Sequence, residues 1–343
     1  MRLSPTFARF ALSSMALSSM TLLASVPAGA QTVVKYGVAA ISMSHAPAMM
    51  AVAAPEIFAK HGIRMDLTDF RGNSQNCLTA MITGAVETCQ TGTTTGTDAI
   101  AEGANIKGIA VIIGPISEIV LSAKSVAKLG GVNATSPLAD RMRALKGLRL
   151  VSSGPGTAHY VTLDAMMKKA GMSISDIKFR TLGDTIAMME GIRNDQIDGA
   201  MWTVGTLAGV LADKSGVRWI NVAGGEVPEF RGVPYVTTYA QTAWVEKNPD
   251  TVARVHAALS DATAAMKKEP AKYSKLLKDK YFPQMDQALW DESYKQGVPS
   301  LLDGARAPKA SWEYFLQLQA ENTKKDYSKA AWERALIPAA QSK

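Results

Sequence analysis

The sequence contains only two cysteines, Cys77 and Cys89, among its 343 residues. Its four histidines, at positions 45, 61, 159 and 256, form no HExxH motif and do not pair with the cysteines at the spacing of metal ligands. The sequence therefore predicts no metal site. In an exported chain a disulfide between the two cysteines is conceivable, and two buried thiols are the alternative, because sequence does not give their separation.

Basic residues are too dispersed to form a nucleic-acid groove. The formal net charge is +7, and the densest group of lysines, within residues 267–280, alternates with acidic residues as on a solvated helix face. Aromatic residues make up 7% of the chain and do not interleave with basic clusters. We expect no nucleic-acid partner.

Motifs that would indicate catalysis are also missing. The chain has no GK[ST] phosphate loop, no complete GxGxxG, no Ser-His-Asp order and no paired-carboxylate motif. We therefore expect a protein that is not an enzyme and that carries no cofactor.

Long hydrophobic runs occur only near the N-terminus. Arg2 and Arg9 precede an uncharged run over residues 10–26, which is followed by the small-residue sequence PAGA. This order predicts a secretory signal peptide, residues 1–30, cleaved after Ala30. A retained membrane anchor is the alternative, which the serine-rich, short apolar core disfavours. Cleavage would lower the net charge from +7 to +5, since residues 1–30 contain two arginines and no acidic residue.

The remaining chain alternates strands and helices in two similar halves. Short apolar or alternating segments predict strands in the first half at residues 32–40, 63–69, 86–90 and 106–113, and in the second at 148–152, 177–181, 196–202 and 217–222. Helical patterns separate them, so we expect α/β units with mostly parallel sheets and ligands at the carboxyl ends of the strands. Residues 249–268, 273–281, 287–296 and 311–324 predict a helical C-terminal segment.

Residues 145–163, LKGLRLVSSGPGTAHYVTL, join a strand to a helix through a glycine-rich turn. Thr157 is placed to cap the helix. Such a helix start directs free backbone amides toward one point and suits an anion, although a structural turn has the same pattern.

Several fragments in a fixed order identify a family. They are YG at 36–37, EIFAKHGI at 56–63, LKG at 145–147, GT at 156–157, AGM at 170–172 and QIDGA at 196–200. Together they resemble the periplasmic solute-binding proteins of ABC importers, in the branch that includes nitrate, sulfonate, taurine and thiamine-pyrimidine-precursor proteins. The resemblance covers roughly residues 33–270.

The resemblance implies a type II-like periplasmic-binding-protein fold, with two α/β lobes, hinge strands and a helical C-terminal wrap. Lobe I would comprise residues 31–115 and 230–343, and lobe II residues 116–229. The ligand would lie between the lobes.

The family's contact loops fall on a set of residues that we predict to bind the ligand: Ser42, Met43, Ser44, His45, Ser74, Gln75, Asn76, Thr93, Thr94, Glu118, Gly156, Thr157, Ala158, His159, Asp184, Trp202 and Thr203. These loops offer hydroxyls, amides and helix starts, and no Lys or Arg, which favours a monoanionic carboxylate or sulfonate over a dianion. Trp202 would stack on a flat ligand, although a tryptophan at a strand end also suits a core. Glu118 and Asp184 leave an amine-bearing or heterocyclic ligand open.

The resemblance implies a monomeric periplasmic protein that captures a small organic anion, aromatic or heterocyclic ligands included, and delivers it to the permease and ATPase of an ABC importer. Two alternatives remain. One is a pyrimidine-synthase-like enzyme on the same scaffold, which the lack of a cysteine cluster disfavours, and the other is a ligand-sensing accessory protein.

Overall fold

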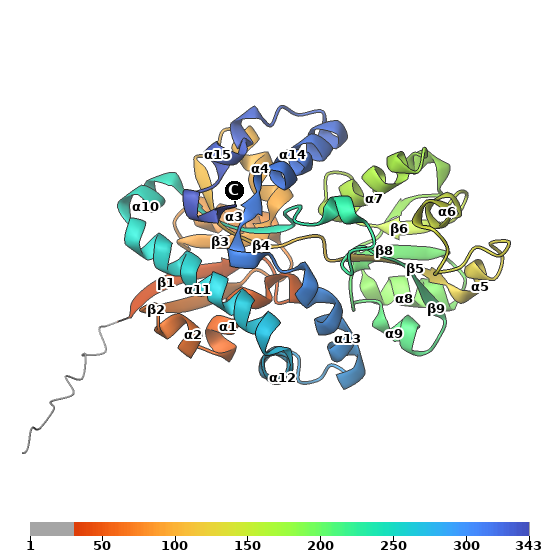
Figure 1. Cartoon of the computed structure of the whole chain (residues 1–343), viewed down its shortest axis with the longest axis horizontal. Coiled ribbons are helices and arrows are strands. Elements are labelled where there is room, and N and C mark those ends of the chain that lie inside the picture. Colours follow the sequence, from red (N-terminus) through yellow and green to blue (C-terminus); the bar gives the residue numbers. More distant parts are fainter. Residues whose placement is uncertain (1–30, 343) are drawn as a thin grey trace, which may run out of the picture. The chain divides into compact units, whose positions relative to one another are not determined.

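The computed structural model describes residues 31–342, so the predicted signal peptide lies outside the described residues. Two five-stranded sheets organise this part of the chain (Figure 1). The first has the order β2-β1-β3-β10-β4, with β1 (Thr32–Val38), β2 (Ile63–Asp69), β3 (Thr88–Gly92), β4 (Ile106–Ile113) and β10 (Val236–Gln241). The second has the order β7-β6-β8-β5-β9, with β5 (Ser117–Ser122), β6 (Leu150–Ser152), β7 (Arg180–Thr181), β8 (Gly199–Thr203) and β9 (Gly216–Asn221).

Each sheet contains one strand that runs against the other four. In the first sheet β10 pairs antiparallel with both β3 and β4, and in the second β5 pairs antiparallel with both β8 and β9. The parallel pairs are β1–β2, β1–β3, β6–β7 and β6–β8. Four of the five strands in each sheet therefore run in the same direction, as predicted, and the single reversed strand in each sheet was not predicted. The cause is that the chain crosses from β4 to β5 and back from β9 to β10, and each crossing inserts its strand into the sheet in reverse.

The two crossings form the hinge strands of a two-lobe α/β fold. Residues 114–116 connect β4 to β5, and residues 222–235 connect β9 to β10. Ser300 lies against both, because its hydroxyl is 3.1 Å from the Pro115 carbonyl oxygen and 3.2 Å from that of Ala223.

Helices cover both sheets (Figure 1). Those that pack around the first sheet are α1 (Ala46–Ala53), α2 (Glu56–Ala59), α3 (Ser74–Ile82), α4 (Thr93–Ala101), α10 (Thr242–Lys247), α11 (Pro249–Lys268), α12 (Pro270–Tyr281) and α15 (Trp332–Ala335). Those around the second are α5 (Ala123–Val126), α6 (Leu138–Arg143), α7 (Ala158–Lys169), α8 (Thr185–Arg193) and α9 (Ala208–Ala212). Among residues 31–342 no helix is long and apolar enough to cross a membrane.

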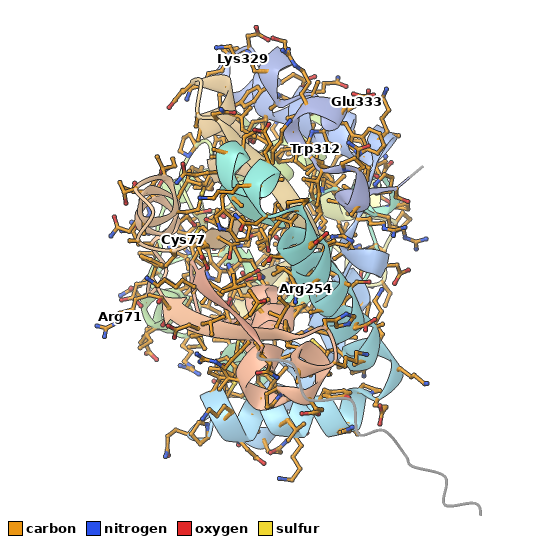
Figure 2. All side chains as sticks on the ribbon, turned by 90° about the vertical axis from the view of Figure 1, so that its left-hand side faces the viewer. Arg71, Cys77, Arg254, Trp312, Lys329 and Glu333 are labelled. Atoms are coloured by element: carbon orange, nitrogen blue, oxygen red, sulfur yellow. A yellow bond between two sulfur atoms is a disulfide. The ribbon has the colours of Figure 1, made fainter. Side chains whose placement is uncertain are left out.

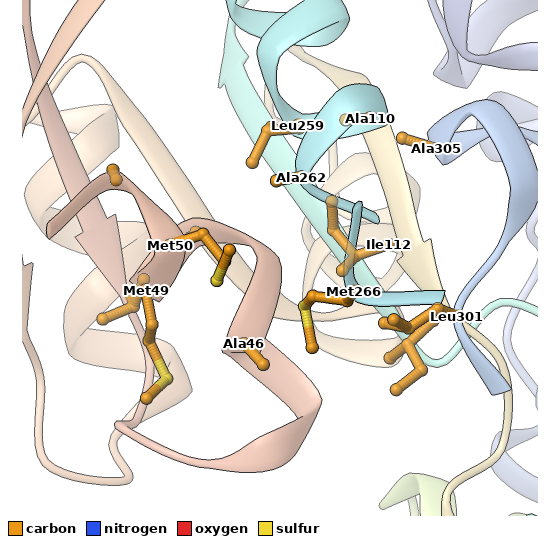
Figure 3. Packing of buried hydrophobic residues seen from close by; sticks show 14 of the residues in the cluster. Ala46, Met49, Met50, Ala110, Ile112, Leu259, Ala262, Met266, Leu301 and Ala305 are labelled. Carbon is orange, nitrogen blue, oxygen red and sulfur yellow. The ribbon is translucent and has the colours of Figure 1, made fainter. Parts of the chain in front are cut away.

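The core of the first sheet rests on α1 and α11. Figure 3 shows Ala46, Met49 and Met50 of α1 near Leu259, Ala262 and Met266 of α11. α11 spans the residues that the sequence predicted, with Pro249 in its first turn, where the missing amide costs no hydrogen bond. All six side chains are buried, so this packing holds α1 firmly against the rest of the first sheet's layer.

The C-terminal helices contact elements of both sheets. α13 (Gln287–Gly297) packs on α9 and on the 3₁₀ turn η1 (Met43–His45), and α14 (Lys309–Thr323) packs on α7. The Glu292 carboxylate lies 2.6 Å from Arg218 of β9, and the Gln296 side chain accepts from Asn221 at 2.7 Å. The predicted helical wrap is thus present, and it joins the two halves of the chain.

Cys77 of α3 and Cys89 of β3 form a disulfide, with 5.8 Å between their Cα atoms (Figure 2). The sequence left this pairing open against two buried thiols. The bond ties the helix to the strand that follows it, across a sequence separation of 12 residues.

Candidate functional site

Both sheets place polar residues at the carboxyl ends of their strands. η1 follows β1, α4 starts at the end of β3, α7 follows β6, and Trp202 and Thr203 end β8. The predicted residues on these segments are Ser42, Met43, Ser44, His45, Thr93, Thr94, Gly156, Thr157, Ala158, His159, Trp202 and Thr203. Most of these residues are buried or half-buried.

His45 ends η1 directly before α1. Its Nδ1 lies 3.1 Å from the Ser42 hydroxyl and 3.0 Å from the Ser44 hydroxyl, and these hydroxyls are 2.8 Å apart. Its Nε2 is buried without a hydrogen-bond partner. Burial lowers the pKa of His45 to about 4, although the nearby Gln90 carbonyl opposes the shift, so the ring is neutral at neutral pH.

His159 lies in the first turn of α7 and contacts both hinge strands. Its Nδ1 is 2.8 Å from the Ser117 hydroxyl, and its Nε2 is 2.9 Å from the Tyr235 hydroxyl. Thr203 lies 3.3 Å from the same Nε2. Burial lowers the pKa of His159 to about 4 and raises the pKa of Tyr235 above its usual value, so neither side chain is charged at neutral pH.

Trp202 stacks on His159, with ring centroids 5.0 Å apart and planes inclined by 28°. The indole is only half-buried. Because the imidazole covers one face, the exposed part of the indole is the part that remains for a ligand.

The start of α7 is capped as predicted. The Thr157 hydroxyl accepts from the Tyr160 amide at 3.5 Å and donates to the Gly154 carbonyl at 2.7 Å. The Gly156 amide, however, already donates to the Asn322 side chain at 3.1 Å. Asn322 belongs to α14, so the C-terminal wrap takes up one of the amides that the sequence assigned to an anion. Ala158 is the first residue of the helix and contributes only its backbone.

The sequence pattern favours a helix over residues 97–102, whereas α4 begins four residues earlier, at Thr93. Thr93 and Thr94 therefore lie in its first turn, and both are buried. The Thr93 hydroxyl is 2.9 Å from that of Thr237, and the Thr93 amide donates to the Tyr235 carbonyl at 2.9 Å. These contacts fix the helix start against β10.

Met43 serves as packing. It is buried in the cluster around α1 and α11, and the chain of α13 approaches it so closely that a Cβ on Gly297 would lie 2.6 Å from its Cγ. The sequence suggests Met43 either as an apolar wall of the ligand site or as packing, and in this structure α13 lies against its side chain.

Glu118 and Asp184 both have local partners. Glu118 is fully buried on β5 and accepts from the Arg218 guanidinium at 2.6 Å and from the Gly205 amide at 3.0 Å. Burial raises the pKa of Glu118, and the Arg218 charge opposes that shift. Asp184 is exposed and caps α8 by accepting from the amides of Ile186 and Ala187, at 2.9 and 3.1 Å. Glu118 is paired with Arg218 and is not available to a cation, whereas both bonds to Asp184 go to Oδ1, so Asp184 alone still leaves an amine-bearing ligand open.

Ser74, Gln75 and Asn76 form the first turn of α3, and Gln75 and Asn76 are exposed. The Asn76 amide donates to Asn73, which is the N-cap. Within residues 31–342 no hydrogen bond joins these three side chains to the two histidines.

Sequence reasoning missed several polar residues inside the strands. Tyr36 of β1, Gln90 of β3 and Thr238 of β10 are fully buried and hydrogen-bonded to one another. Ser117 and Tyr235, which bond His159, were not among the predicted site residues. The available signal was the glutamine in the predicted strand 86–90, because a glutamine inside a sheet needs hydrogen-bond partners for its amide.

A cavity of about 390 Å³ lies elsewhere, beside the hinge strands, and is lined by Gly114, Pro115, Val222, Ala223, Gly224, Gly225, Phe230, Arg231, Gly232, Lys267, Pro299, Ser300, Leu301, Leu302 and Asp303. None of the predicted ligand residues lines it. In the part of the chain that the structure describes, no group of three or more His, Cys, Asp or Glu side chains is arranged to hold a metal ion.

Several solved structures share this fold with the chain. The aliphatic sulphonate binding protein SsuA of Escherichia coli has 16% identity and a TM-score of 0.63, covering 79% of this chain and 84% of its own. The alkanesulfonate-binding protein SsuA of Xanthomonas axonopodis pv. citri, bound to MOPS, has 17% identity and a TM-score of 0.61, covering 91% and 99%. A putative sulfonate-binding SsuA of Methylobacillus flagellatus has 14% identity and a TM-score of 0.68, covering 90% and 92%. The chain thus has the periplasmic-binding-protein fold.

A family model described as NMT1/THI5 like matches residues 42–273. The chain belongs to this NMT1/THI5-like family. No curated protein matches it in sequence.

Proposed function

We propose that this protein is the extracytoplasmic solute-binding component of an ABC importer. It captures a small organic anion, a sulfonate or a carboxylate and in particular an aromatic or heterocyclic one, and delivers it to a membrane permease and its ATPase. The observation that carries the proposal is a pair of polar groups at strand ends. One is η1 with His45, after a strand of the first sheet, and the other is the start of α7 with His159, after a strand of the second. The fold that presents them is shared with binding proteins.

The proposed lobes follow from the two crossings. Lobe I comprises residues 31–115 and 230–343, and lobe II comprises residues 116–229, with the ligand between them. Export through the N-terminal signal, cleavage after Ala30 and a monomer in the periplasm complete the proposal. The family model and the neighbouring structures, which are named as periplasmic proteins, support it.

Binding without turnover separates this function from an enzyme on the same scaffold. Neutral, fully engaged His159 and the engaged carboxylates of Glu118 and Asp184 favour a binding site. The test is thermal unfolding of the mature protein with nitrate, alkanesulfonates, taurine, aromatic carboxylates, pyrimidines and purines. A true ligand at a hundredfold excess over Kd stabilises the native state by about 2.7 kcal/mol.

The compound that stabilises the protein is then incubated with it and recovered. Unchanged recovery supports a binding protein, whereas conversion of the compound would make the protein an enzyme. A pull-down of the co-expressed permease in the presence of that compound distinguishes an importer component from a ligand sensor.

A further inference from the structure

Polar side chains are buried together on the face of the first sheet that α1 covers. Tyr36, Gln90 and Thr238 are each 0% exposed. The backbone register places Gln90 of β3 opposite Thr238 of β10 and beside Val38 of β1, near the carboxyl ends of β1 and β3. His45 is 6% exposed, and its ring lies near the Gln90 carbonyl.

The hydrogen bonds leave the Gln90 amide group free to donate. The Tyr36 hydroxyl donates to Gln90 Oε1 at 2.7 Å, and the Thr238 hydroxyl, 2.6 Å from that of Tyr36, donates in turn to Tyr36. This chain fixes the orientation of the Gln90 side chain. Its Nε2, which carries two protons, has no partner and no exposure to solvent.

His45 offers a second free donor. Its Nδ1 is satisfied when the Ser42 hydroxyl donates to Ser44 and the Ser44 hydroxyl donates to Nδ1. The ring proton then lies on Nε2, which is also buried and unpartnered. A buried donor without an acceptor is costly, and the His45 ring lies near the Gln90 backbone, so the unpartnered donors of these two neighbouring residues indicate a missing acceptor.

We propose that Gln90 and His45 form the polar end of the ligand site and select a group that accepts hydrogen bonds and carries at most one negative charge. A carbonyl, a carboxylate, a sulfonate or a ring nitrogen fits, and an ammonium group or a dianion does not. The inference rests on the proposed function and assigns Gln90, with Tyr36 as its positioning residue, to recognition.

The charges around the cluster agree with this selection. The hydrogen-bond partners of the Gln90 and His45 side chains are hydroxyls and backbone, and burial keeps the His45 ring neutral. Two negative charges would be desolvated there with no countercharge. Methionines line the neighbouring core, namely Met43, Met49 and Met50, and their flexible side chains can repack when a ligand enters.

Five probes test the selection by thermal unfolding of the mature protein: benzoate, ethanesulfonate, uracil, sulfate and benzylamine. At least one of the first three is expected to raise the midpoint, and sulfate and benzylamine are not. The affinity of the stabilising probe is expected to change less than about twofold between low and high salt, because its partners are uncharged. Stabilisation by sulfate or benzylamine, or a steep fall in affinity with salt, overturns the proposal.

Gln90→Leu and His45→Phe are each expected to weaken the stabilising probe at least about tenfold. Gln319→Leu is the matched control, because Gln319 is equally buried and also has one unpartnered atom, but it lies on α14 and bonds Asp98. If Gln90→Leu does not fold, His45→Phe and the salt series decide the question.

The outcomes separate the two proposals. If a probe binds equally to wild type, Gln90→Leu and His45→Phe, the free donors are satisfied by water and this inference fails, while the proposed function stands. If none of the five probes stabilises the wild-type protein, this inference fails, and the proposed function is decided by the wider ligand set that includes nitrate, taurine and purines.

Discussion

The Tyr235 hydroxyl lies 2.9 Å from Nε2 of His159. Tyr235 ends the crossing from β9 to β10, and His159 lies in the first turn of α7, so this contact links a hinge strand to a predicted ligand loop. Ser117, at the end of the other crossing, bonds the opposite nitrogen of the same ring. A movement of the hinge therefore changes the surroundings of His159 directly.

Tyr235→Phe removes the hydroxyl and leaves a buried imidazole nitrogen with one weaker partner. We expect a loss of about 1 to 2 kcal/mol in the free energy of unfolding and a weaker affinity for the stabilising ligand. Urea unfolding and calorimetric titration measure the two effects. Tyr281→Phe is the control, because the Tyr281 hydroxyl bonds the Met49 carbonyl outside this contact and should affect stability alone. Equal ligand affinity in both variants would contradict the role of Tyr235.

Acid should destabilise the protein through its two site histidines. Burial lowers the pKa of both His45 and His159 from about 6.5 to about 4, so the unfolded chain binds protons that the native state does not. Their contribution is complete above pH 6.5 and is lost as the pH falls toward 4. Unfolding free energies measured across this range should fall by a few kcal/mol.

His159→Gln isolates one of the two protons. The slope of stability against pH between 6.5 and 4 should become shallower by about one proton in this variant. An unchanged slope would mean that His159 titrates normally in the folded protein.

Reduction of the disulfide should weaken the packing of α3 on β3. Closing a short loop between Cys77 and Cys89 contributes about 3 kcal/mol, so dithiothreitol should lower the urea midpoint of the native protein clearly. The variant with serine at both positions should start at the lower midpoint and show no response to the reductant. If complete reduction leaves the urea midpoint of the wild-type protein unchanged, the disulfide does not contribute this stability.

Glu118→Gln tests whether that carboxylate serves structure or ligand. The change takes the charge away from Arg218, a half-buried partner, and should cost about 1 to 3 kcal/mol of stability without altering ligand affinity. Glu333→Gln, in the exposed pair with Lys309, should leave the midpoint unchanged. A loss of affinity with normal stability would return Glu118 to the binding site.

Trp202→Ala tests the exposed part of the indole. An aromatic ligand that stacks there should lose about fivefold or more in affinity, whereas an alkanesulfonate should lose less. Titration of both compounds into both proteins measures this difference. Identical losses would show that Trp202 acts only by holding His159.

The sequence predicted helices well where residues close in the chain determine where the helix begins. The helix predicted over residues 249–268 is α11, and Thr157 was identified as the cap of α7. The start of α4 was misplaced, since its first turn consists of threonines that disfavour helix in isolation and that contacts with Tyr235 and Thr237 hold in place. The direction of β5 and β10 depends on the crossings, which no local pattern reports.

The candidate site likewise combines loops that local sequence predicts with residues whose role depends on distant parts of the chain. Loops with recognisable turns, such as those at Ser42 and Gly156, were found from sequence, although their role as ligand contacts is still a prediction. The amide of Gly156 is occupied by Asn322, which lies far along the chain. Gln90 looked like any strand residue, because its importance comes from the orientation that Tyr36 gives it and from a second donor on His45.

The insertion of β10 between β3 and β4 sets an order in which the molecule can be assembled. During synthesis from the N-terminus, β1 to β4 are made well before β10. The strand that lies between β3 and β4 is therefore absent until β5 to β9 have also been made. The second sheet has no such gap, because all five of its strands are contiguous in the chain from β5 to β9. The second sheet, made in the middle of the chain, is therefore able to complete first, and the first sheet keeps the facing edges of β3 and β4 open to wrong partners until β10 pairs with both.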